Sequence, residues 1–241
     1  MKRAVIMGAT SGMGQEVASI LAGKGWKIGV AGRREEKLKE LQLLFPQNIE
    51  YQVIDIEKEN APEHLLSLID KIGGMDLYFH GSGVGWHNGE LDLSKELKTV
   101  STNALGFTRM VDSAWHYFRQ KGEGHIAVIS SIAGVKGLGP APSYSATKSF
   151  DNTYIQALAQ LSRSSGLKIR FTDIRPGFVD TPLLDTSKHH YPMLMDQKKV
   201  ARKIVRAVER KKRVAVIDWR YSILVFFWRL IPNCIWERIR L

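Results

Sequence analysis

Short apolar runs alternate with longer segments of helical period along almost the whole chain. Runs of the first kind are typical of buried strands, and segments of the second kind are typical of helices that pack on them. The predicted strands cover residues 4–7, 28–31, 51–54, 77–79, 126–129, 169–174 and 214–217. The predicted helices cover residues 12–24, 34–44, 61–72, 94–120, 143–165 and 197–212.

This alternation predicts the fold class. Neighbouring parallel strands need a crossover connection, and the crossover helix packs on the sheet. We therefore expect an α/β fold, a doubly wound parallel sheet with helices on both faces. No repeat or Pro/Gly/Ser-rich linker divides the chain, and the composition changes only after Asp218. We predict one domain over residues 1–218 and an aromatic and basic extension over residues 219–241.

Composition narrows the class of protein. The 241 residues are 44% hydrophobic and 24% charged, which excludes a disordered or collagen-like chain. A single cysteine, Cys234, excludes an intrachain disulfide framework and argues against a zinc site, so we expect a cytoplasmic protein without metal. The longest apolar stretch, residues 223–228, is shorter than the about 20 residues of a membrane-spanning helix, and we expect no signal peptide.

The net charge of +11 is concentrated near one end of the chain. Residues 1–187 carry 21 basic and 20 acidic side chains, whereas residues 188–241 carry 14 basic and four acidic ones. Proteins that bind nucleic acid show such a concentration, but so do segments that lie on anionic membranes and plain solvated helix faces. Charge alone therefore does not identify a partner.

A glycine-rich turn follows the first predicted strand, with the sequence Gly8-Ala-Thr-Ser-Gly12-Met-Gly14, and leads into a predicted helix. Glycines allow the backbone to approach a pyrophosphate, and a helix N-terminus supplies free N–H groups and a positive dipole. Taken alone, the turn also fits an ordinary strand-to-helix connection. We predict that it binds the phosphates of a dinucleotide.

Further segments carry a family resemblance. The glycine spacing resembles that of short-chain dehydrogenases/reductases, and Tyr144-Ser-Ala-Thr-Lys148 resembles their Tyr-x-x-x-Lys signature. Ser131 lies thirteen residues before the tyrosine, as the family's catalytic serine does, and Asn103 resembles its catalytic asparagine. The motifs follow in family order over residues 1 to about 218. The resemblance implies a Rossmann-like fold and hydride transfer between a nicotinamide cofactor and a carbonyl or alcohol.

The chemistry expected of these residues can be argued physically. Tyr144 and Lys148, at positions i and i+4, share one face of a helix, and a neighbouring ammonium favours the phenolate form of tyrosine. Tyr144 would thus handle the proton, while the resemblance implies that Lys148 also holds the nicotinamide ribose. Ser131 would hydrogen-bond the substrate oxygen, and Asn103 would hold a water between Lys148 and solvent. Without the other motifs, the pair also fits ordinary packing on an exposed helix face.

The resemblance extends to the cofactor site. Pro176-Gly-Phe-Val-Asp-Thr181 resembles the family's Pro-Gly-x-Val-x-Thr segment, and Asp55 resembles the acidic residue that contacts the adenine. The residues that we expect to bind the cofactor are Gly8, Thr10, Ser11, Gly12, Met13, Gly14, Arg33, Arg34, Asp55, Ile56, Gly83, Tyr144, Lys148, Pro176, Gly177, Val179 and Thr181.

The end of the second strand indicates which nicotinamide cofactor is bound. NAD-preferring sites place a carboxylate there for the ribose 2′-hydroxyl, whereas NADP sites offer arginine to the 2′-phosphate. Gly32 occupies the carboxylate position, and Arg33 and Arg34 follow it. The alternative is that both arginines are solvated residues of a helix start, although basic residues oppose the helix dipole there. We predict that NADP(H) is preferred over NAD(H).

One segment departs from the family pattern. Where the family usually has Asn-Asn-Ala-Gly after the fourth strand, the chain has His80-Gly-Ser-Gly83. We expect His80 to be a structural, hydrogen-bonded residue, and the same interpretation applies to His87. His189 and His190 fall in residues 182–196, where the family has its mobile substrate loop. They are either solvated or in contact with substrate.

The extension over residues 219–241 contains three of the six tryptophans and four arginines. This content predicts contact with anionic lipid. Packing between subunits of a homo-oligomer or against the substrate pocket remains an alternative, and nucleic-acid binding is not expected. Arg220 and Arg229 fall on opposite sides of a helix, so its amphipathicity is imperfect. Pro232 is expected to break the extension into two short pieces.

The substrate itself is not evident from the sequence. Residues 84–93, 132–143 and 182–196 are expected to border an apolar pocket for a small carbonyl or alcohol, which is lipophilic if lipid is its source. The expected apolar lining is Leu138, Pro140, Pro142, Phe178, Leu183, Leu184 and Met193. A second hypothesis is a nucleotide-sensing or membrane-docking protein on the same fold without turnover. The intact set of catalytic residues favours the enzyme.

Overall fold

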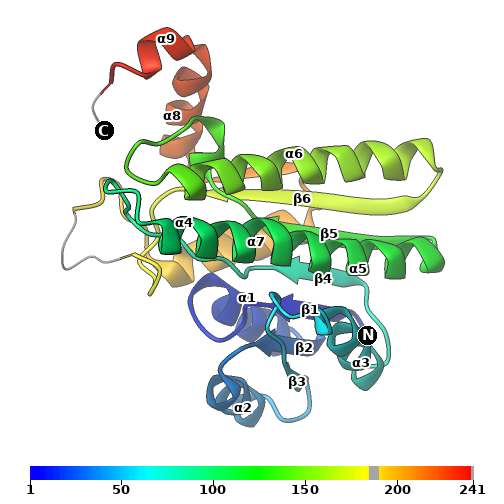
Figure 1. The fold of residues 1–241 in the computed structure, drawn as a ribbon. Coiled ribbons are helices and arrows are strands. Elements are labelled where there is room, and N and C mark those ends of the chain that lie inside the picture. The colour runs from blue at the N-terminus through cyan, green and yellow to red at the C-terminus, as the bar shows by residue number, and fades with distance from the viewer. Residues whose placement is uncertain (185–189, 240–241) are drawn as a thin grey trace.

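In the computed structural model, which describes residues 1–184 and 190–239, seven parallel strands form one sheet in the order β3-β2-β1-β4-β5-β6-β7 (Figure 1). The strands are β1 (Arg3–Met7), β2 (Lys27–Gly32), β3 (Ile49–Val53), β4 (Leu77–His80), β5 (Glu123–Ile129), β6 (Lys168–Pro176) and β7 (Val214–Ile217). Every predicted strand is present, and the parallel doubly wound sheet is confirmed.

Helices cover both faces of this sheet (Figure 1). One face carries α1 (Gly12–Gly23), α2 (Glu35–Leu44), α7 (Gln197–Glu209) and α8 (Trp219–Leu230). The other face carries α3 (Ala61–Lys71), α5 (Phe107–Lys121) and α6 (Pro142–Ser164), and α4 (Leu93–Val100) packs against α6. The predicted helix boundaries lie within a few residues of these, which is the usual uncertainty of helix ends.

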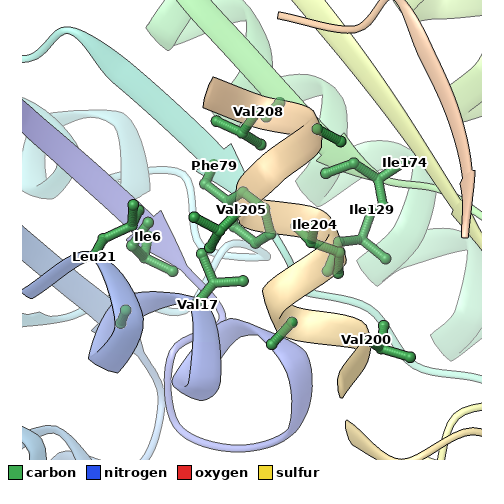
Figure 2. Close-up of a cluster of buried hydrophobic side chains, with 14 of the residues drawn as sticks. Ile6, Val17, Leu21, Phe79, Ile129, Ile174, Val200, Ile204, Val205 and Val208 are labelled. Atoms are coloured by element: carbon green, nitrogen blue, oxygen red, sulfur yellow. The ribbon is translucent and has the colours of Figure 1, made fainter. Parts of the chain in front are cut away.

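Alternation along the strands divides the core in two. In β1, Ile6 points to the α1 and α7 side, whereas Val5 points to the α3 and α5 side, because successive strand residues face opposite ways. Figure 2 shows Ile6 packed with Leu21 of α1 and with Val205 of α7. The amphipathic pattern of α7 therefore directs its aliphatic residues inward and its many basic residues to solvent, as one interpretation of its sequence expected.

The predicted helix over residues 94–120 contains a π-helical segment. Helices α4 and α5 are joined by η1 (Ser101–Gly106), a π-helix in which Thr102, Asn103 and Gly106 are buried. Such segments insert residues into a helix and are frequent at functional sites. Hydrophobic periodicity did not reveal it, because the apolar face continues through both helices.

The extension after Asp218 folds back on the domain. It forms α8 and α9 (Asn233–Trp236), with the break at Pro232 that the sequence predicts. Tyr221 and Val225 of α8 join the buried cluster of the α1 and α7 face. Trp236 Nε1 donates a 2.7 Å hydrogen bond to the carbonyl of Gly137. The extension thus shares the core of the domain, while Arg240 lies outside the described residues.

No helix in residues 1–184 and 190–239 combines the length and apolar character needed to cross a bilayer.

Candidate active site

Four strand ends place the sequence motifs at one edge of the sheet. The glycine-rich turn follows β1, residues 81–83 follow β4, Ser131 follows β5, and residues 177–181 follow β6. These are all carboxyl ends, because the strands are parallel. The chain leaves β1 for β2 on one side and returns to β4 on the other, and α/β sheets bind ligands at such a switch point.

The backbone conformation and close packing of the glycine-rich turn require glycine at three positions. Gly8 and Gly12 have positive φ values of 88° and 59°, which favour glycine. A Cβ on Gly8 would lie 2.6 Å from the backbone nitrogen of Ser82, and one on Gly14 would overlap the carbonyl oxygen of Gly8. The turn therefore lies directly against the segment after β4, and α1 approaches β1 closely.

The N-terminus of α1 is open to an anion. Ser11 is the N-cap residue but makes no side-chain capping bond, and the first turn of α1 holds no acidic residue. Helix N-termini with free N–H groups bind phosphate well. Thr181 approaches from the segment after β6, with its Cγ2 3.6 Å from a Cβ position on Gly12. Met13 packs against the core below.

Arg34 lies across this turn. Its Nη2 donates to Thr10 Oγ1 at 3.0 Å and to Ser11 Oγ at 2.6 Å. Arg33 is exposed beside it. At the end of β2, a Cβ on Gly32 would lie 2.7 Å from Thr10 Cγ2. The position where an NAD site carries a carboxylate thus has little room for a side chain and has two guanidinium groups next to it.

The next predicted contacts follow β3. Asp55 is half-buried, and its Oδ1 accepts a 3.2 Å hydrogen bond from the backbone N–H of Glu57. Ile56 is buried, and its carbonyl accepts a 2.8 Å bond from Arg109 of α5. A Cβ on Gly106 would lie 2.8 Å from Ile56 Cγ1, so the π-helix packs tightly on this turn.

Tyr144 and Lys148 lie in the first two turns of α6, which begins at Pro142. Lys148 Nζ lies 5.9 Å from the centroid of the Tyr144 ring. The ring is half-buried, and a Cβ on Gly85 would lie 2.6 Å from Tyr144 Cδ2. Gly85 therefore allows the loop after β4 to pack on the ring, a contact that the sequence analysis did not foresee.

Ser131 caps the short 3-10 helix η2 (Ile132–Val135) that follows β5. Its Oγ accepts a 3.0 Å hydrogen bond from Ala133 N–H and donates a 3.4 Å bond to the carbonyl of Pro176. Ser131 is therefore also the N-cap of this short helix. The hydrogen bond that Ser131 donates to Pro176 is long, so the protein holds the hydroxyl hydrogen only weakly.

Asn103 in η1 anchors the loop after β4. Its Oδ1 accepts from Val84 N–H at 2.9 Å, and its Nδ2 donates to Val84 O at 2.7 Å and to Thr147 Oγ1 at 3.3 Å. A Cβ position on Gly83 lies 3.4 Å from Asn103 Oδ1 and 3.7 Å from Lys148 Nζ. The structure thus brings Asn103, Gly83 and Lys148 together.

Lys148 is held by two buried acceptors. Nζ donates to the carbonyl of Ile129 at 3.1 Å and to Asp151 Oδ2 at 2.9 Å. Burial acts to lower the pKa of Lys148, but the charges of Asp151 and Tyr144 outweigh it and raise that pKa. Burial raises the pKa of Asp151 to about 6 against the pull of Lys148. Asp151 is not among the predicted site residues, although its i+3 spacing from Lys148 is a usable signal.

His80 has the structural character that the sequence predicts. Its ring is buried, and Nδ1 shares a 2.9 Å hydrogen bond with the hydroxyl of Tyr78. Burial, with the charge of Lys148, lowers the pKa of His80 to about 3, so the ring is neutral near pH 7. His87 also has an interaction partner, and His190 is exposed. His189 lies outside the described residues.

Tyr221 ties the extension to the site. Its hydroxyl accepts from Phe178 N–H at 3.1 Å and lies 3.1 Å from the carbonyls of Pro192 and Met193. A Cβ on Gly177 would overlap the Tyr221 ring. Val179, in the same segment, is buried and pairs with Met195. The alternative that the extension packs beside the substrate pocket therefore has direct contacts in its favour.

The loop after β5 also borders a cavity of about 580 Å³, whose lining includes Leu138, Pro142 and Asn233. Leu138 and Pro142 are two of the residues expected in the substrate pocket. None of the four expected catalytic residues is in the lining of this cavity. The cavity is therefore distinct from the space in front of Tyr144.

Comparison with known proteins places these features in a family. The model of the short chain dehydrogenase family matches residues 2–192. An uncharacterized oxidoreductase of Mycobacterium tuberculosis is 31% identical, over 96% of this chain and 95% of its own length. An uncharacterized oxidoreductase of Myxococcus xanthus is 28% identical, over 98% of this chain and 95% of its own.

Solved structures share the fold at lower identity. Serine dehydrogenase complexed with NADP⁺ superposes with a TM-score of 0.80 at 23% identity, over 89% of this chain and 94% of that one. Levodione reductase gives 0.81 at 20% identity, over 92% and 98% of the two chains. An alcohol dehydrogenase from the archaeon Thermococcus sibiricus, complexed with 5-hydroxy-NADP, gives 0.76 at 24%, over 90% and 95%.

Proposed function

The chain belongs to the short-chain dehydrogenase family, and we propose that it is an NADP(H)-dependent oxidoreductase that interconverts a carbonyl and an alcohol. The observation that carries this proposal is the placement of Lys148. Two buried acceptors hold its ammonium beside Tyr144 and close to Gly83, where a Cβ position lies 3.7 Å from Nζ. Such a placement lets Lys148 favour the phenolate form of Tyr144 and leaves one of its donors for a ribose hydroxyl.

The residues present fit a nicotinamide dinucleotide. Members of this family bind such cofactors, and the glycine cradle at Gly8 and Gly12 with the uncapped start of α1 suits a diphosphate. The nicotinamide, when bound, accepts or supplies the hydride. Lys148 would hold the nicotinamide ribose, and the segment 176–181 would border the nicotinamide end.

The protein side chains would divide the remaining work. Tyr144 would donate the proton to the substrate oxygen as the hydride reaches the carbonyl carbon, or accept it in the reverse direction, and the nearby Lys148 ammonium would stabilise the phenolate that donation leaves. Ser131 would turn its weakly held hydroxyl to the same oxygen and stabilise developing charge there. Asn103 would hold the loop at Val84 and a water that links Lys148 to solvent.

Preference for NADP(H) is supported by charge and space. A guanidinium binds a 2′-phosphate with charge-assisted hydrogen bonds, whereas a carboxylate would repel it. Arg33 and Arg34 supply the guanidinium groups, and the close approach of Gly32 to Thr10 leaves little room for a competing acidic side chain. Two solved structures with this fold are complexed with NADP⁺ and 5-hydroxy-NADP.

We further propose that the enzyme acts in the cytoplasm, as a homo-oligomer and on a lipophilic substrate, with peripheral membrane contact through residues 219–241. Exposed leucines at positions 93, 97 and 105, on α4 and η1, support subunit contact, since large apolar patches on monomers are uncommon. The contacts of Tyr221 with the segment after β6 and with residues 192–193 support a link between the extension and the substrate.

The second candidate is a nucleotide-sensing or membrane-docking protein that has lost turnover. The presence of Ser131, Tyr144 and Lys148 together argues against this candidate, because a protein without turnover would not need all three.

The test is a titration with NADPH followed by turnover with a broad panel of aldehydes and ketones. We expect saturable NADPH binding and loss of the NADPH absorbance with at least one carbonyl class. Tight NADPH binding with no oxidation across the panel, or in the reverse direction with alcohols and NADP⁺, would favour the second candidate.

A further inference from the structure

Helix α8 is apolar on two opposite sides. One side, with Tyr221 and Val225, is buried against the domain. The other side is exposed, and we call it the outer face of α8. Its side chains are exposed to 70%, 49%, 60%, 58% and 63%, in the order Trp219, Ile223, Phe226, Phe227 and Leu230. A helix that is apolar all round is ordinarily covered on every side, so the outer face lacks a cover.

The arginines of α8 border this face. At about 100° per residue, the outer face occupies an arc of about 100° of the helix circumference. Arg220 lies just beyond Phe227 at one border, and Arg229 lies beyond Phe226 at the other. From the sequence, the opposite placement of the two arginines indicates imperfect amphipathicity. In the structure they lie at the two borders of the apolar arc and leave it unbroken. Both arginine side chains are solvent-accessible, and Arg220 Nε also donates a 2.9 Å hydrogen bond to Asp218, while Arg229 is exposed at the opposite border.

This arrangement matches a helix that lies in a membrane interface. Apolar and aromatic side chains enter the boundary between headgroups and acyl chains, and basic side chains at the borders reach up to anionic phosphates. Figure 1 shows α8 and α9 at the periphery of the molecule, where a flat surface can reach them. The continuation of the chain adds exposed Ile235 and Ile239 and the basic Arg238.

The outer face of α8 could be covered by lipid or by a second copy of the chain, and the charge around it favours lipid. Residues 188–241 carry 14 basic and four acidic side chains, a complement to an anionic surface. A two-fold contact through the outer face would bring Arg220 and Arg229 of both copies onto one interface, with like charges opposed. We propose that the outer face of α8 docks the protein on an anionic lipid bilayer.

The same helix connects this surface to the site. Tyr221, on the buried side, contacts Phe178 and residues 192–193, so one helix diameter of about 10 Å separates the bilayer side from the substrate segments. Docking would therefore hold Phe178 and residues 192–193, which we expect to border the substrate, close to the membrane surface, and the substrate class would be membrane-dissolved carbonyls or alcohols. This second step rests on the proposed function, whereas the docking itself does not.

The docking is tested by co-sedimentation of the full chain with vesicles of phosphatidylcholine alone or with about one third phosphatidylserine. The informative variant is Phe226→Glu with Phe227→Glu, whose side chains are exposed and whose replacement leaves the core intact. The matched control is Leu43→Glu with Leu44→Glu on α2, where the same charge is added at two adjacent leucines that are also exposed, to 78% and 70%. Melting temperatures of both variants verify folding.

We expect the parent and the control to bind anionic vesicles at least about tenfold more tightly than neutral ones, with binding weakened by salt. The Phe226 and Phe227 variant should lose about tenfold or more of that binding, because two phenyl rings leave the bilayer. Equal binding of the variant and the control, or a parent that stays in the supernatant, overturns the proposal. So does a change of oligomeric mass in the variant, which would identify a second copy as the cover.

Activity on a water-soluble carbonyl separates this proposal from the proposed function. If docking is right, the Phe226 and Phe227 variant keeps the parent turnover in the absence of lipid. Absence of turnover in the parent would refute the enzyme, while the vesicle result would still decide the docking.

Discussion

The ammonium of Lys148 lies 2.9 Å from the carboxylate of Asp151, and both side chains are buried, with 6% and 1% of their areas exposed. The carbonyl of Ile129 accepts a second bond from the same ammonium. A lysine ammonium has three donors, so one donor remains for a group at the site. The pair thus fixes the position of Lys148 and supplies its counter-charge.

Replacing Asp151 with Asn should be costly, because the buried ammonium then loses its nearest counter-charge. We expect a loss of about 3 kcal/mol in the free energy of unfolding, together with a higher KM for NADPH. Urea unfolding and initial rates measure the two effects. Asp70→Asn, at an exposed position on α3, is the matched control. Equal stability of the two variants would show that Asp151 is not ionised in the folded protein.

Replacing Tyr144 with Phe should remove the proton donor and leave the ring packing against Gly85. Turnover should fall by about 10² to 10⁴, the usual contribution of a positioned acid or base, while the NADPH dissociation constant stays nearly unchanged. Tyr154→Phe, on the same helix and stacked on Phe150, is the control. Undiminished turnover of the Tyr144 variant would remove this residue from the mechanism.

Replacing Arg33 or Arg34 with Ala should weaken NADPH far more than NADH, because only NADPH has a 2′-phosphate. We expect a loss of about tenfold in NADPH affinity for each arginine, the value of one charge-assisted hydrogen bond. Arg34 has the additional bonds to Thr10 and Ser11, so its loss also loosens the turn. Dissociation constants from fluorescence titration check this. Equal weakening of both cofactors would contradict the 2′-phosphate assignment.

Acid should destabilise the protein through its buried histidines. Burial lowers the pKa of His125 to about 4, with a contribution from Lys211, while the unfolded value is near 6.5. The stabilisation is therefore fully present above pH 6.5 and is lost as the pH falls toward 4. His125 should account for about 2 kcal/mol of the stability lost between pH 7 and pH 5. Denaturant unfolding of His125→Gln at both pH values should show a correspondingly flatter dependence; an unchanged dependence would refute the assignment.

Much of the fold was predictable from local patterns. The strands at residues 4–7 and 214–217 and the helices between them follow from apolar periodicity, and parallel order follows from their alternation. The π-helix at η1 was not predictable, because Ser101 to Gly106 continues the helical pattern on the same face. Its insertion becomes visible only where Asn103 meets Val84 and Thr147.

Some residues of the candidate site were likewise predictable from local sequence, and others were not. Tyr144, Lys148 and the glycine-rich turn stand at recognisable spacings, so the sequence indicates them directly. The partner of Lys148 and the role of Tyr221 depend on contacts between distant parts of the chain. Tyr221 meets Phe178 only because α8 folds back over Gly177, and nothing local in residues 219–230 specifies that contact.

Transfer of deuterium from labelled NADPH to a carbonyl would demonstrate the proposed hydride transfer. The protein would be incubated with the carbonyl panel and with NADPH that carries deuterium on one face of C4 or, in a separate reaction, on the other. The masses of the alcohol products would be measured by mass spectrometry. We predict an alcohol one mass unit heavier with one of the two labelled cofactors, and about 10² to 10⁴ times less of it with Tyr144→Phe. Saturating NADPH binding with no deuterium in any product would contradict the account.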